Sequence, residues 1–339
     1  MFQVFAILLG LFLAWAAAWT LASYFSFRDG VDAANSRLPN SARRALTPKD
    51  GLLFDTSTTI LLLGTDHSTL QSRATSNRSD SMMLLRTDPA HDRLYYLSIP
   101  RDLYVDIPGY GQNRINAAYQ TGGAALAIKT VERLTDLPIN HVAVVDFNEF
   151  KKLIDEIGGI DVNVPKPIWS NPFDCPFPAS KCQTWKGWRF GRGVQHMNGE
   201  RALVYTRIRE NRLDPSENDL TRAQRQQQVI QAVSSKLASV GTFFDLPFIG
   251  GDLMKPVATD LSAGQFMQLA WVRWRAGSGS AVHCRLGGSP TYVNGNAVLQ
   301  SSEDNRAVIT MFTGKSAPQP PPPGASSYEP GCVVGNGTL

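Results

Sequence analysis

The feature that most constrains this sequence is an uncharged apolar run near its beginning. Residues 2–27 read FQVFAILLGLFLAWAAAWTLASYFSF and contain no Lys, Arg, Asp or Glu. A helix of this length would span a bilayer, because the hydrocarbon core takes about 20 apolar residues. A cleaved signal peptide is the alternative, since small residues follow the apolar core, but the run is longer than a usual signal-peptide core. We therefore predict a transmembrane anchor over residues 1–27.

The basic residues around this anchor bear on which side of the membrane the following domain lies. No Lys or Arg precedes the apolar run, whereas four arginines follow it within residues 28–44. Taken alone, this would place the following domain in the cytoplasm, because cytoplasmic flanks are enriched in basic residues. The cysteine content indicates the opposite side.

The four cysteines are arranged as expected for disulfides rather than for a metal site. They are Cys175, Cys182, Cys284 and Cys332, and none has the CxxC spacing of a zinc or redox site. The simplest pairing joins Cys175 to Cys182 and Cys284 to Cys332, although other pairings remain open, and such bonds persist in oxidising compartments. Giving the cysteines more weight, we predict a single-pass cell-membrane protein whose folded domain is extracytoplasmic.

Apolar runs and helical patterns alternate through the middle of the chain. Strand-like runs lie at 58–63, 81–85, 94–99, 141–147 and 160–164, and helical spacing lies at 116–134 and 150–157. Gly122 and Gly123 weaken the first helical pattern, so we expect that helix to begin after them. Alternation of this kind predicts an α/β fold with a central mixed β-sheet flanked by helices.

Composition suggests the domain boundaries. Of the 339 residues, 43% are hydrophobic, which is enough to bury one large core or two modest ones. The polar segment 28–50 is predicted to be a linker, 51–315 a single domain, and the Pro-rich segment 316–339 a tail that buries little. Within the domain, Asn198 and Ser262 are predicted helix caps. Trp271 and Trp274 lie one turn apart, a pattern more typical of a core than of a ligand platform.

Charged residues follow two of the predicted strands. Asp66 comes soon after the run 58–63, and Arg101 comes soon after the run 94–99. Because ligands of open α/β sheets bind beyond the carboxyl ends of the strands, we expect Asp66 and Arg101 at one edge of the sheet. The alternatives are that Asp66 and Asp80 cap turns, and that Arg101 pairs only with Asp102 at the surface.

The densest positive charge lies in residues 201–228. This segment, RALVYTRIRENRLDPSENDLTRAQRQQQ, contains six arginines, although the net charge of the chain is only +4. Helical spacing places Gln226 in an otherwise apolar stripe, with Arg222 and Arg225 one turn apart. Neighbouring guanidinium groups repel each other unless an anion lies among them, and they suit phosphate oxygens. A solvated basic helix face is the alternative. Sparse aromatic residues argue against single-stranded nucleic acid, so we predict a phosphate or diphosphate ligand.

A series of short motifs lies in order along residues 58–237. They are RSDSMML at 78–84, SIPRD at 98–102, IPG at 107–109, RINAAY at 114–119, VDF at 145–147, GGI at 158–160, NGERAL at 198–203, YTRIR at 205–209 and DLTRAQRQQ at 219–227. At this order and spacing the series resembles the LytR-CpsA-Psr (LCP) family of bacterial cell envelopes. Further motifs, CRLGG at 284–288 and MFTG at 311–314, are similar to actinobacterial members of that family.

The resemblance implies roles for particular residues. The diphosphate-binding residues of the family correspond to Arg78, Arg101, Arg207, Arg209, Arg222, Arg225 and Gln226. Its magnesium ligands correspond to Asp66 and Asp80, so Mg²⁺ is the implied cofactor. Arg101, Asp80 and Arg207 are the implied catalytic residues, and either Asp80 or Asp219 is the general base. The chain departs from the family pattern in a longer segment at 211–218 and in the loop between Cys175 and Cys182. We expect the cysteine loop to shape the choice of acceptor.

The resemblance also implies an LCP-like fold and an activity. That activity is a glycopolymer-phosphate transferase, which moves a glycopolymer from a polyprenyl-diphosphate carrier in the membrane onto peptidoglycan with Mg²⁺-assisted cleavage of the diphosphate. Pyrophosphatase side activity is expected when water replaces the acceptor. The alternative is a non-catalytic module that binds polyprenyl-diphosphate lipid. A DNA-binding regulator is rejected, because the membrane segment and the cysteines place the domain outside the cell and no recognition-helix motif occurs. No nucleic acid partner is expected.

Overall fold

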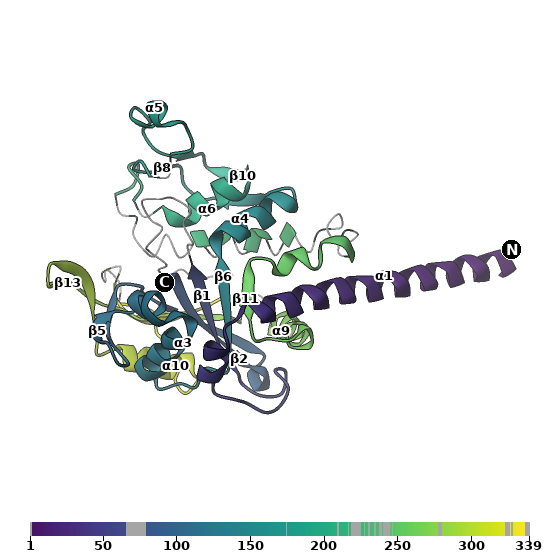
Figure 1. The fold of residues 1–339 in the computed structure, drawn as a ribbon, viewed down its shortest axis with the longest axis horizontal. Coiled ribbons are helices and arrows are strands. Elements are labelled where there is room, and N and C mark those ends of the chain that lie inside the picture. The colour runs from purple at the N-terminus through teal and green to yellow at the C-terminus, as the bar shows by residue number, and fades with distance from the viewer. Residues whose placement is uncertain are drawn as a thin grey trace.

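The structure is a computed structural model of the chain. It describes residues 2–65, 79–173, 175–208, 210–215, 217, 225–226, 228–229, 231–233, 235–236, 239, 245, 247–276, 280–322, 326 and 328–335. Figure 1 shows a long N-terminal helix that leads into a folded domain with two lobes. The lower lobe contains the large β-sheet, and the upper lobe contains α4, α6 and several short strands.

A seven-stranded mixed sheet is the centre of the lower lobe. Its order is β11 (Val257–Thr259), β6 (His141–Asp146), β1 (Thr59–Thr65), β2 (Ser79–Asp88), β3 (Arg93–Ile99), β12 (Val282–Arg285) and β15 (Gly331–Val334). The pairs β1–β6 and β3–β12 are parallel, and the other neighbours are antiparallel. The predicted central mixed sheet is therefore confirmed, and the strand-like runs 58–63, 81–85, 94–99 and 141–147 are β1, β2, β3 and β6.

Helices cover both faces of this sheet. On one face, α3 (Asn116–Thr135), α10 (Asn305–Phe312) and α2 (Asn40–Ala45) pack onto an apolar core that includes Leu61, Leu84 and Leu97. On the other face, α9 (Ala263–Ala276) packs through Val272 and Ala276 against Leu94. The alternation of side chains along each strand separates these two sets of contacts.

The helix α3 differs from the prediction at its start. It begins at Asn116, before the two glycines, and Gly122 and Gly123 form a break with φ angles of −133° and 59° inside it. Glycine adopts a positive φ at little cost. Two helical stretches meet at this kink, so a helix does begin after the two glycines, as predicted, and a further helical stretch precedes it.

A second, four-stranded sheet was not predicted. Its order is β13 (Gly288–Val293), β14 (Asn296–Ser301), β4 (Leu103–Ile107) and β5 (Gly111–Arg114). The β13–β14 hairpin turns at Asn294 and Gly295, with φ angles of 51° and 75°. Two consecutive residues with positive φ are typical of a type I′ turn, and Asn-Gly favours that turn.

The upper lobe has its own apolar core. It contains α4 (Phe147–Glu156), β7 (Ile160–Val164), β8 (Ile168–Trp169), α5 (Ala179–Cys182), β9 (Arg189–Phe190), β10 (Gly193–Met197) and α6 (Gly199–Arg207). Asn198 caps α6 by accepting a hydrogen bond from the Arg201 backbone N–H at 2.9 Å, as predicted. Phe190 and Tyr205 are fully buried large side chains of this core.

Ser262 also caps its predicted helix, α9, since its hydroxyl accepts a hydrogen bond from the Gln265 N–H.

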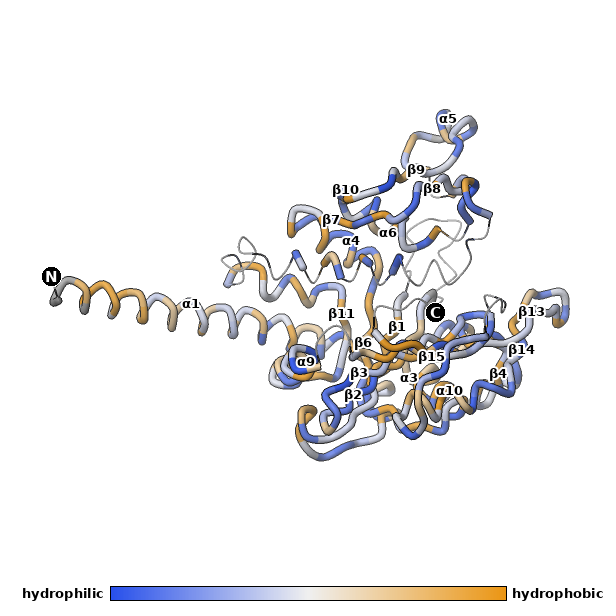
Figure 2. Tube along the Cα trace, turned by 180° about the vertical axis from the view of Figure 1, so that it is seen from behind, coloured by the Kyte–Doolittle hydropathy of each residue, from blue (hydrophilic) through white to orange (hydrophobic). Residues whose placement is uncertain are grey.

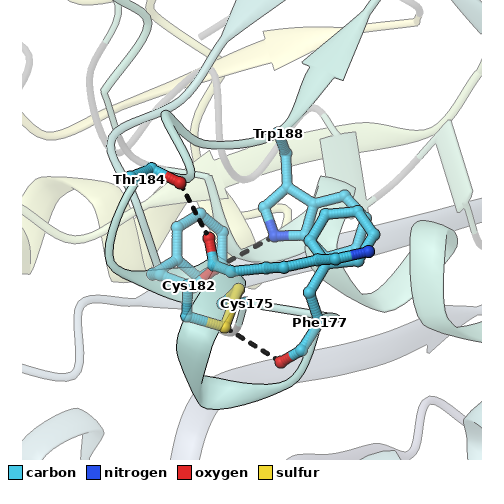
Figure 3. The surroundings of a disulfide bond; sticks show 7 residues. Cys175, Phe177, Cys182, Thr184 and Trp188 are labelled. Carbon is cyan, nitrogen blue, oxygen red and sulfur yellow. Dashed lines mark hydrogen bonds between the residues drawn. A yellow bond between two sulfur atoms is a disulfide. The ribbon is translucent and has the colours of Figure 1, made fainter.

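Both predicted disulfide pairs are present. Cys175 and Cys182 close a loop of the upper lobe, beside which the Trp188 Nε1 donates a hydrogen bond to the Phe173 carbonyl at 3.0 Å (Figure 3). Cys284 and Cys332 lie opposite each other in the neighbouring strands β12 and β15.

The chain on either side of the domain is more ordered than the composition suggested. The helix α1 (Phe2–Arg37) continues into the predicted linker and α2 follows it there, and Val31, Leu38 and Ala42 are buried. The Pro-rich segment returns as β15, in which Cys332 is fully buried. The expectations of a free linker and of a tail that buries little are therefore wrong for these residues.

Within the described residues, α1 is the one helix long and apolar enough to cross a membrane. Figure 2 shows its apolar residues along the part that projects away from the domain.

Candidate functional site

Three strands of the central sheet end at the same edge. The strands β1 and β6 are parallel, and β3 has the same direction because it and β1 both pair antiparallel with β2. Thr65 ends β1 beside Asp146, which ends β6, and Arg101 follows the end of β3 by two residues. The carboxyl ends of strands thus meet where the sequence predicted a ligand site. We call this the sheet edge.

The strand β2 begins at the sheet edge with an irregular register. Gly64 pairs with Ser81 and Thr65 pairs with Ser79, so Asp80 is an extra residue between two ladder positions. Such a β-bulge changes the local twist of a strand and is common beside active sites. The irregular register therefore places Asp80 in a β-bulge at the sheet edge.

Gly64 lets an aromatic ring approach the sheet edge. A Cβ atom on Gly64 would lie 2.5 Å from the Cζ of Phe147, the first residue of α4. Any larger residue at position 64 would collide with this ring. The close contact fixes the start of α4 against the end of β1.

Asp146 holds the start of α4. Its side chain accepts hydrogen bonds from the backbone N–H groups of Asn148 at 2.8 Å and Glu149 at 3.1 Å. A carboxylate at this position satisfies helix donors that otherwise have no partner and interacts favourably with the positive end of the helix dipole. Asp146 is therefore a structural anchor that ties the upper lobe to the central sheet.

Tyr119 is a polar residue of this region to which sequence reasoning gave no role. Burial raises the pKa of its phenol, a hydrogen bond with the Thr65 side chain lowers it, and the charge of Asp146 raises it. The side chain therefore belongs to the same group as Thr65 and Asp146. Its position in the motif at 114–119 was the signal that could have identified it.

Arg101 is fixed by its neighbours on both sides. Its Nε lies 3.4 Å from Asp102 Oδ2, while Arg114 Nη1 lies 3.8 Å from Asp102 Oδ1. The Arg101 carbonyl accepts a hydrogen bond from the Asn116 N–H at the start of α3. The Arg101 side chain keeps 23% of its surface exposed. The predicted contact with Asp102 is present, and part of the Arg101 side chain is accessible to solvent.

Arg207 ends α6 in the upper lobe. This helix packs on α4, where the Gly199 N–H donates to Asp155 Oδ1 at 2.7 Å. The Arg207 side chain is half-buried, as is that of Gln226. Arg207 therefore belongs to the lobe that α4 connects to the sheet edge.

Arg225 is placed differently from Arg101 and Arg207. Its guanidinium forms an ion pair with Glu217, donates to the Ile208 carbonyl at 2.7 Å and lies 5.9 Å from the Tyr205 ring centroid. The exposed fractions of the Arg225 and Glu217 side chains are only 5% and 7%. Arg225 is thus committed to contacts inside the upper lobe, and its role toward a diphosphate stays a prediction.

Tyr205 completes this buried polar group. Its hydroxyl donates a hydrogen bond to Gln228 Oε1 at 2.6 Å. Burial is the largest cause that raises the pKa of Tyr205 to about 12, against the lowering effect of the Arg225 charge. The phenol is therefore neutral at any physiological pH and acts as a hydrogen-bond donor.

Several predicted site residues lie outside the described residues. They are Arg78, Arg209, Arg222, Asp66 and the further acidic candidate Asp219. Of Asp80 only the backbone is described. The part of the chain that is described holds no cluster of three or more His, Cys, Asp or Glu residues arranged to bind a metal ion. The predicted diphosphate site is thus described for Arg101, Arg207, Arg225 and Gln226 alone.

The chain matches the LytR_cpsA_psr family over residues 24–312. A relative from Bacillus mycoides, named polyisoprenyl-teichoic acid–peptidoglycan teichoic acid transferase TagU, is 35% identical over 211 residues, which are 62% of this chain and 62% of that protein. The match therefore spans less than two thirds of that relative. It comes from Bacillus, so the similarity of the C-terminal motifs to actinobacterial members stays a prediction.

Solved structures have the same fold. TagV from B. subtilis is 27% identical with a TM-score of 0.57, and the match covers 76% of this chain and 98% of TagV. A structure of TagT bound to LIIa-WTA is 26% identical with a TM-score of 0.57, covering 78% of this chain and 94% of TagT. Because the family match extends over residues 24–312, well over half of the sequence, the chain belongs to the LytR-CpsA-Psr family.

Proposed function

We propose that this chain is a membrane-anchored phosphotransferase that moves a glycopolymer from a polyprenyl-diphosphate carrier onto peptidoglycan. The name of the TagU relative describes a transfer of this kind, and TagT has been solved with LIIa-WTA bound. In this proposal α1 holds the domain at the membrane. The domain lies on the extracytoplasmic side, where the two disulfides would persist.

The observation that carries the proposal is the placement of Arg101. It is held at the sheet edge by Asp102 and by the start of α3, yet part of its side chain is exposed. A guanidinium held in this way can donate two parallel hydrogen bonds to phosphate oxygens without losing much conformational freedom on binding. Arg225, in contrast, is almost completely buried by protein contacts.

Mg²⁺ is part of this proposal, with Asp66 and Asp80 as its ligands. Asp80 is the bulge residue beside the Thr65–Ser79 pair, and Asp66 follows Thr65 directly in the sequence. Two carboxylates with phosphate oxygens and water are a donor set that Mg²⁺ prefers. When bound, the ion would neutralise charge on the phosphoryl oxygens. Asp146 is left out of this set because its side chain caps α4.

The chain's own residues have distinct roles in the proposed reaction. Arg101 and Arg207, with Arg78, Arg209 and Arg222, would bind the diphosphate. A hydroxyl group of a peptidoglycan sugar would attack the phosphorus nearest the glycan, and polyprenyl phosphate would leave. Asp80 or Asp219 would accept the proton of the attacking hydroxyl. Most of the catalytic effect would come from positioning and charge stabilisation.

The test uses the full chain with Mg²⁺, a short glycan on a polyprenyl diphosphate, and peptidoglycan oligomers. Mass spectrometry would detect the glycan–phosphate–peptidoglycan product. We expect Arg101→Ala to lower the rate by about 10²-fold, the typical cost of one electrostatic contact to the transition state. Arg133→Ala is the matched control, since that arginine is exposed and pairs with Asp106.

Two results would contradict the proposal. One is the absence of product from the wild-type protein. The other is an equal rate for wild type and Arg101→Ala. Tight binding of the lipid without turnover, for every acceptor tried, would favour the non-catalytic lipid-binding module instead.

A further inference from the structure

The outward face of α9 exposes large apolar side chains. Met267, Trp271 and Trp274 have exposed fractions of 57%, 50% and 71%, and the two indole rings lie 4.9 Å apart. The prediction that these tryptophans belong to a core is therefore wrong. An exposed cluster of this kind usually marks a contact with a partner or a membrane. We call these three residues the α9 face.

The helix α9 contacts the anchor where the apolar run of the anchor ends. Phe27 of α1 and Phe266 of α9 meet edge to face, with ring centroids 5.9 Å apart. Phe27 is the last residue of the uncharged run, and Arg28 follows it. Figure 1 shows α9 beside the end of α1 that enters the domain. The α9 face is thus on a helix that touches the anchor at its charge boundary.

The length of the anchor sets the depth of this contact. The uncharged run of residues 2–27 is about 39 Å long as a helix, at a rise of 1.5 Å per residue. The hydrocarbon core of a bilayer is only about 30 Å thick. The end of the run near Phe27 would therefore lie in the headgroup layer, and α9 would lie beside it.

The chemistry of α9 suits that layer. Tryptophan is enriched at membrane interfaces, because its ring is apolar and its N–H can meet water or headgroups. The α9 sequence, AGQFMQLAWVRWRA, contains two arginines and no acidic residue. Arg275 contacts Asp92 at 2.8 Å, so its charge is partly balanced by the domain. The absence of carboxylates on the helix avoids repulsion from lipid phosphates.

We propose that the α9 face inserts into the headgroup layer of the bilayer that holds α1. The anchor and the α9 face would then fix the domain at two points, which sets its orientation as well as its location. This inference rests on the membrane anchor of the proposed function and names a second membrane contact. Lipid is the ligand proposed for this face.

The test measures quenching of tryptophan fluorescence by brominated lipids. The full chain is placed in nanodiscs with Trp15 and Trp19 of the anchor changed to Phe, so that the remaining tryptophans lie in the domain. We expect bromolipid to quench part of this fluorescence. Adding Trp271→Phe and Trp274→Phe should remove the quenched part, whereas the matched control Trp185→Phe should leave it unchanged.

Two fluorescence results would overturn the inference. The first is no quenching by bromolipid in the background variant, which would leave the α9 face for a protein partner. The second is quenching that persists after both α9 tryptophans are replaced. Neither result depends on transferase activity, so failure of this inference and failure of the proposed function are separate outcomes.

A second measurement relates the contact to turnover. In bilayers with a long-chain lipid substrate, Trp271→Gln with Trp274→Gln should lower the transfer rate several-fold. In detergent with a short-chain substrate, the rate should equal that of wild type, because the sheet edge is unchanged. Equal rates for both proteins in bilayers would contradict a role in orientation.

Discussion

The arginines that look alike in the sequence have different environments in the structure. Arg101 keeps an exposed part at the sheet edge, whereas Arg225 is buried against Glu217. Spacing along a helix cannot distinguish a ligand-binding arginine from a buried one, because the difference depends on which acidic residue the fold brings near. Glu217 lies in the segment at 211–218 that is longer than the family pattern.

At the residue scale, we predict that Arg225→Ala lowers the stability of the domain. Removal of one partner of a buried ion pair costs about 3–5 kcal/mol, because the other charge remains buried without compensation. Thermal unfolding should show a clear fall in Tm, and the double change Arg225→Met with Glu217→Leu should recover most of it. Arg192→Ala, at an exposed arginine of the same lobe, is the control and should leave Tm nearly unchanged.

A different pattern would assign Arg225 to the ligand. If Arg225→Ala left Tm unchanged and abolished binding of the diphosphate lipid, the buried ion pair would not be its principal role.

At the scale of elements, the sequence predicted the long central strands and missed several others, both half-buried ones such as β4 and exposed ones. The strand β1 is buried along nearly its whole length, so its apolar run is continuous. The strands β5 and β13 have mostly exposed side chains and therefore show no apolar alternation. Asn294–Gly295 was a usable turn signal for the β13–β14 hairpin.

The position of one candidate site residue was predicted for the same reason. The placement of Arg101 after a strand followed from the sequence, because the strand pattern fixed its end. The β-bulge at Asp80 and the link from Thr65 to Tyr119 depend on register between strands, which no local pattern encodes.

We predict that the Cys284–Cys332 disulfide stabilises the central sheet more than the Cys175–Cys182 disulfide stabilises its loop. The first pair closes a loop of 48 positions and the second a loop of 7, and longer loops lose more entropy on closure. Replacing Cys284 and Cys332 by Ala should cost about 2–4 kcal/mol. Thermal unfolding of the two double-alanine variants measures the difference, and equal Tm values would contradict this order.

At the scale of the whole molecule, the anchor and the domain form one continuous structure. The Arg37 guanidinium at the end of α1 donates to the Met254 carbonyl at 2.6 Å and to the Val257 carbonyl at 2.9 Å. Gly30 packs against the backbone of Gly251 so closely that a Cβ atom would lie 2.6 Å from its oxygen. The last turns of α1 are thus part of the domain's own packing.

We predict that Gly30→Val separates these turns from the domain. Overpacking of this kind costs about 1–3 kcal/mol, and here the contact is with backbone that cannot rotate away. Hydrogen–deuterium exchange should rise in residues 28–37 and 249–255. Gly10→Val is the matched control, since no atom lies within 4 Å of a Cβ at that position. Unchanged exchange in Gly30→Val would show that the packing is not maintained in the membrane.

The close packing of Gly30 on Gly251 also limits where catalysis could occur. A domain on a flexible tether would sample many heights above the lipid surface, but a domain packed onto its own anchor keeps one. As the protein diffuses laterally, its sheet edge would therefore stay within a thin layer at a constant height above the bilayer. Under the proposed function, only acceptor chains that enter this layer would be modified, so the distance of the cell-wall glycan from the membrane would itself select the substrate.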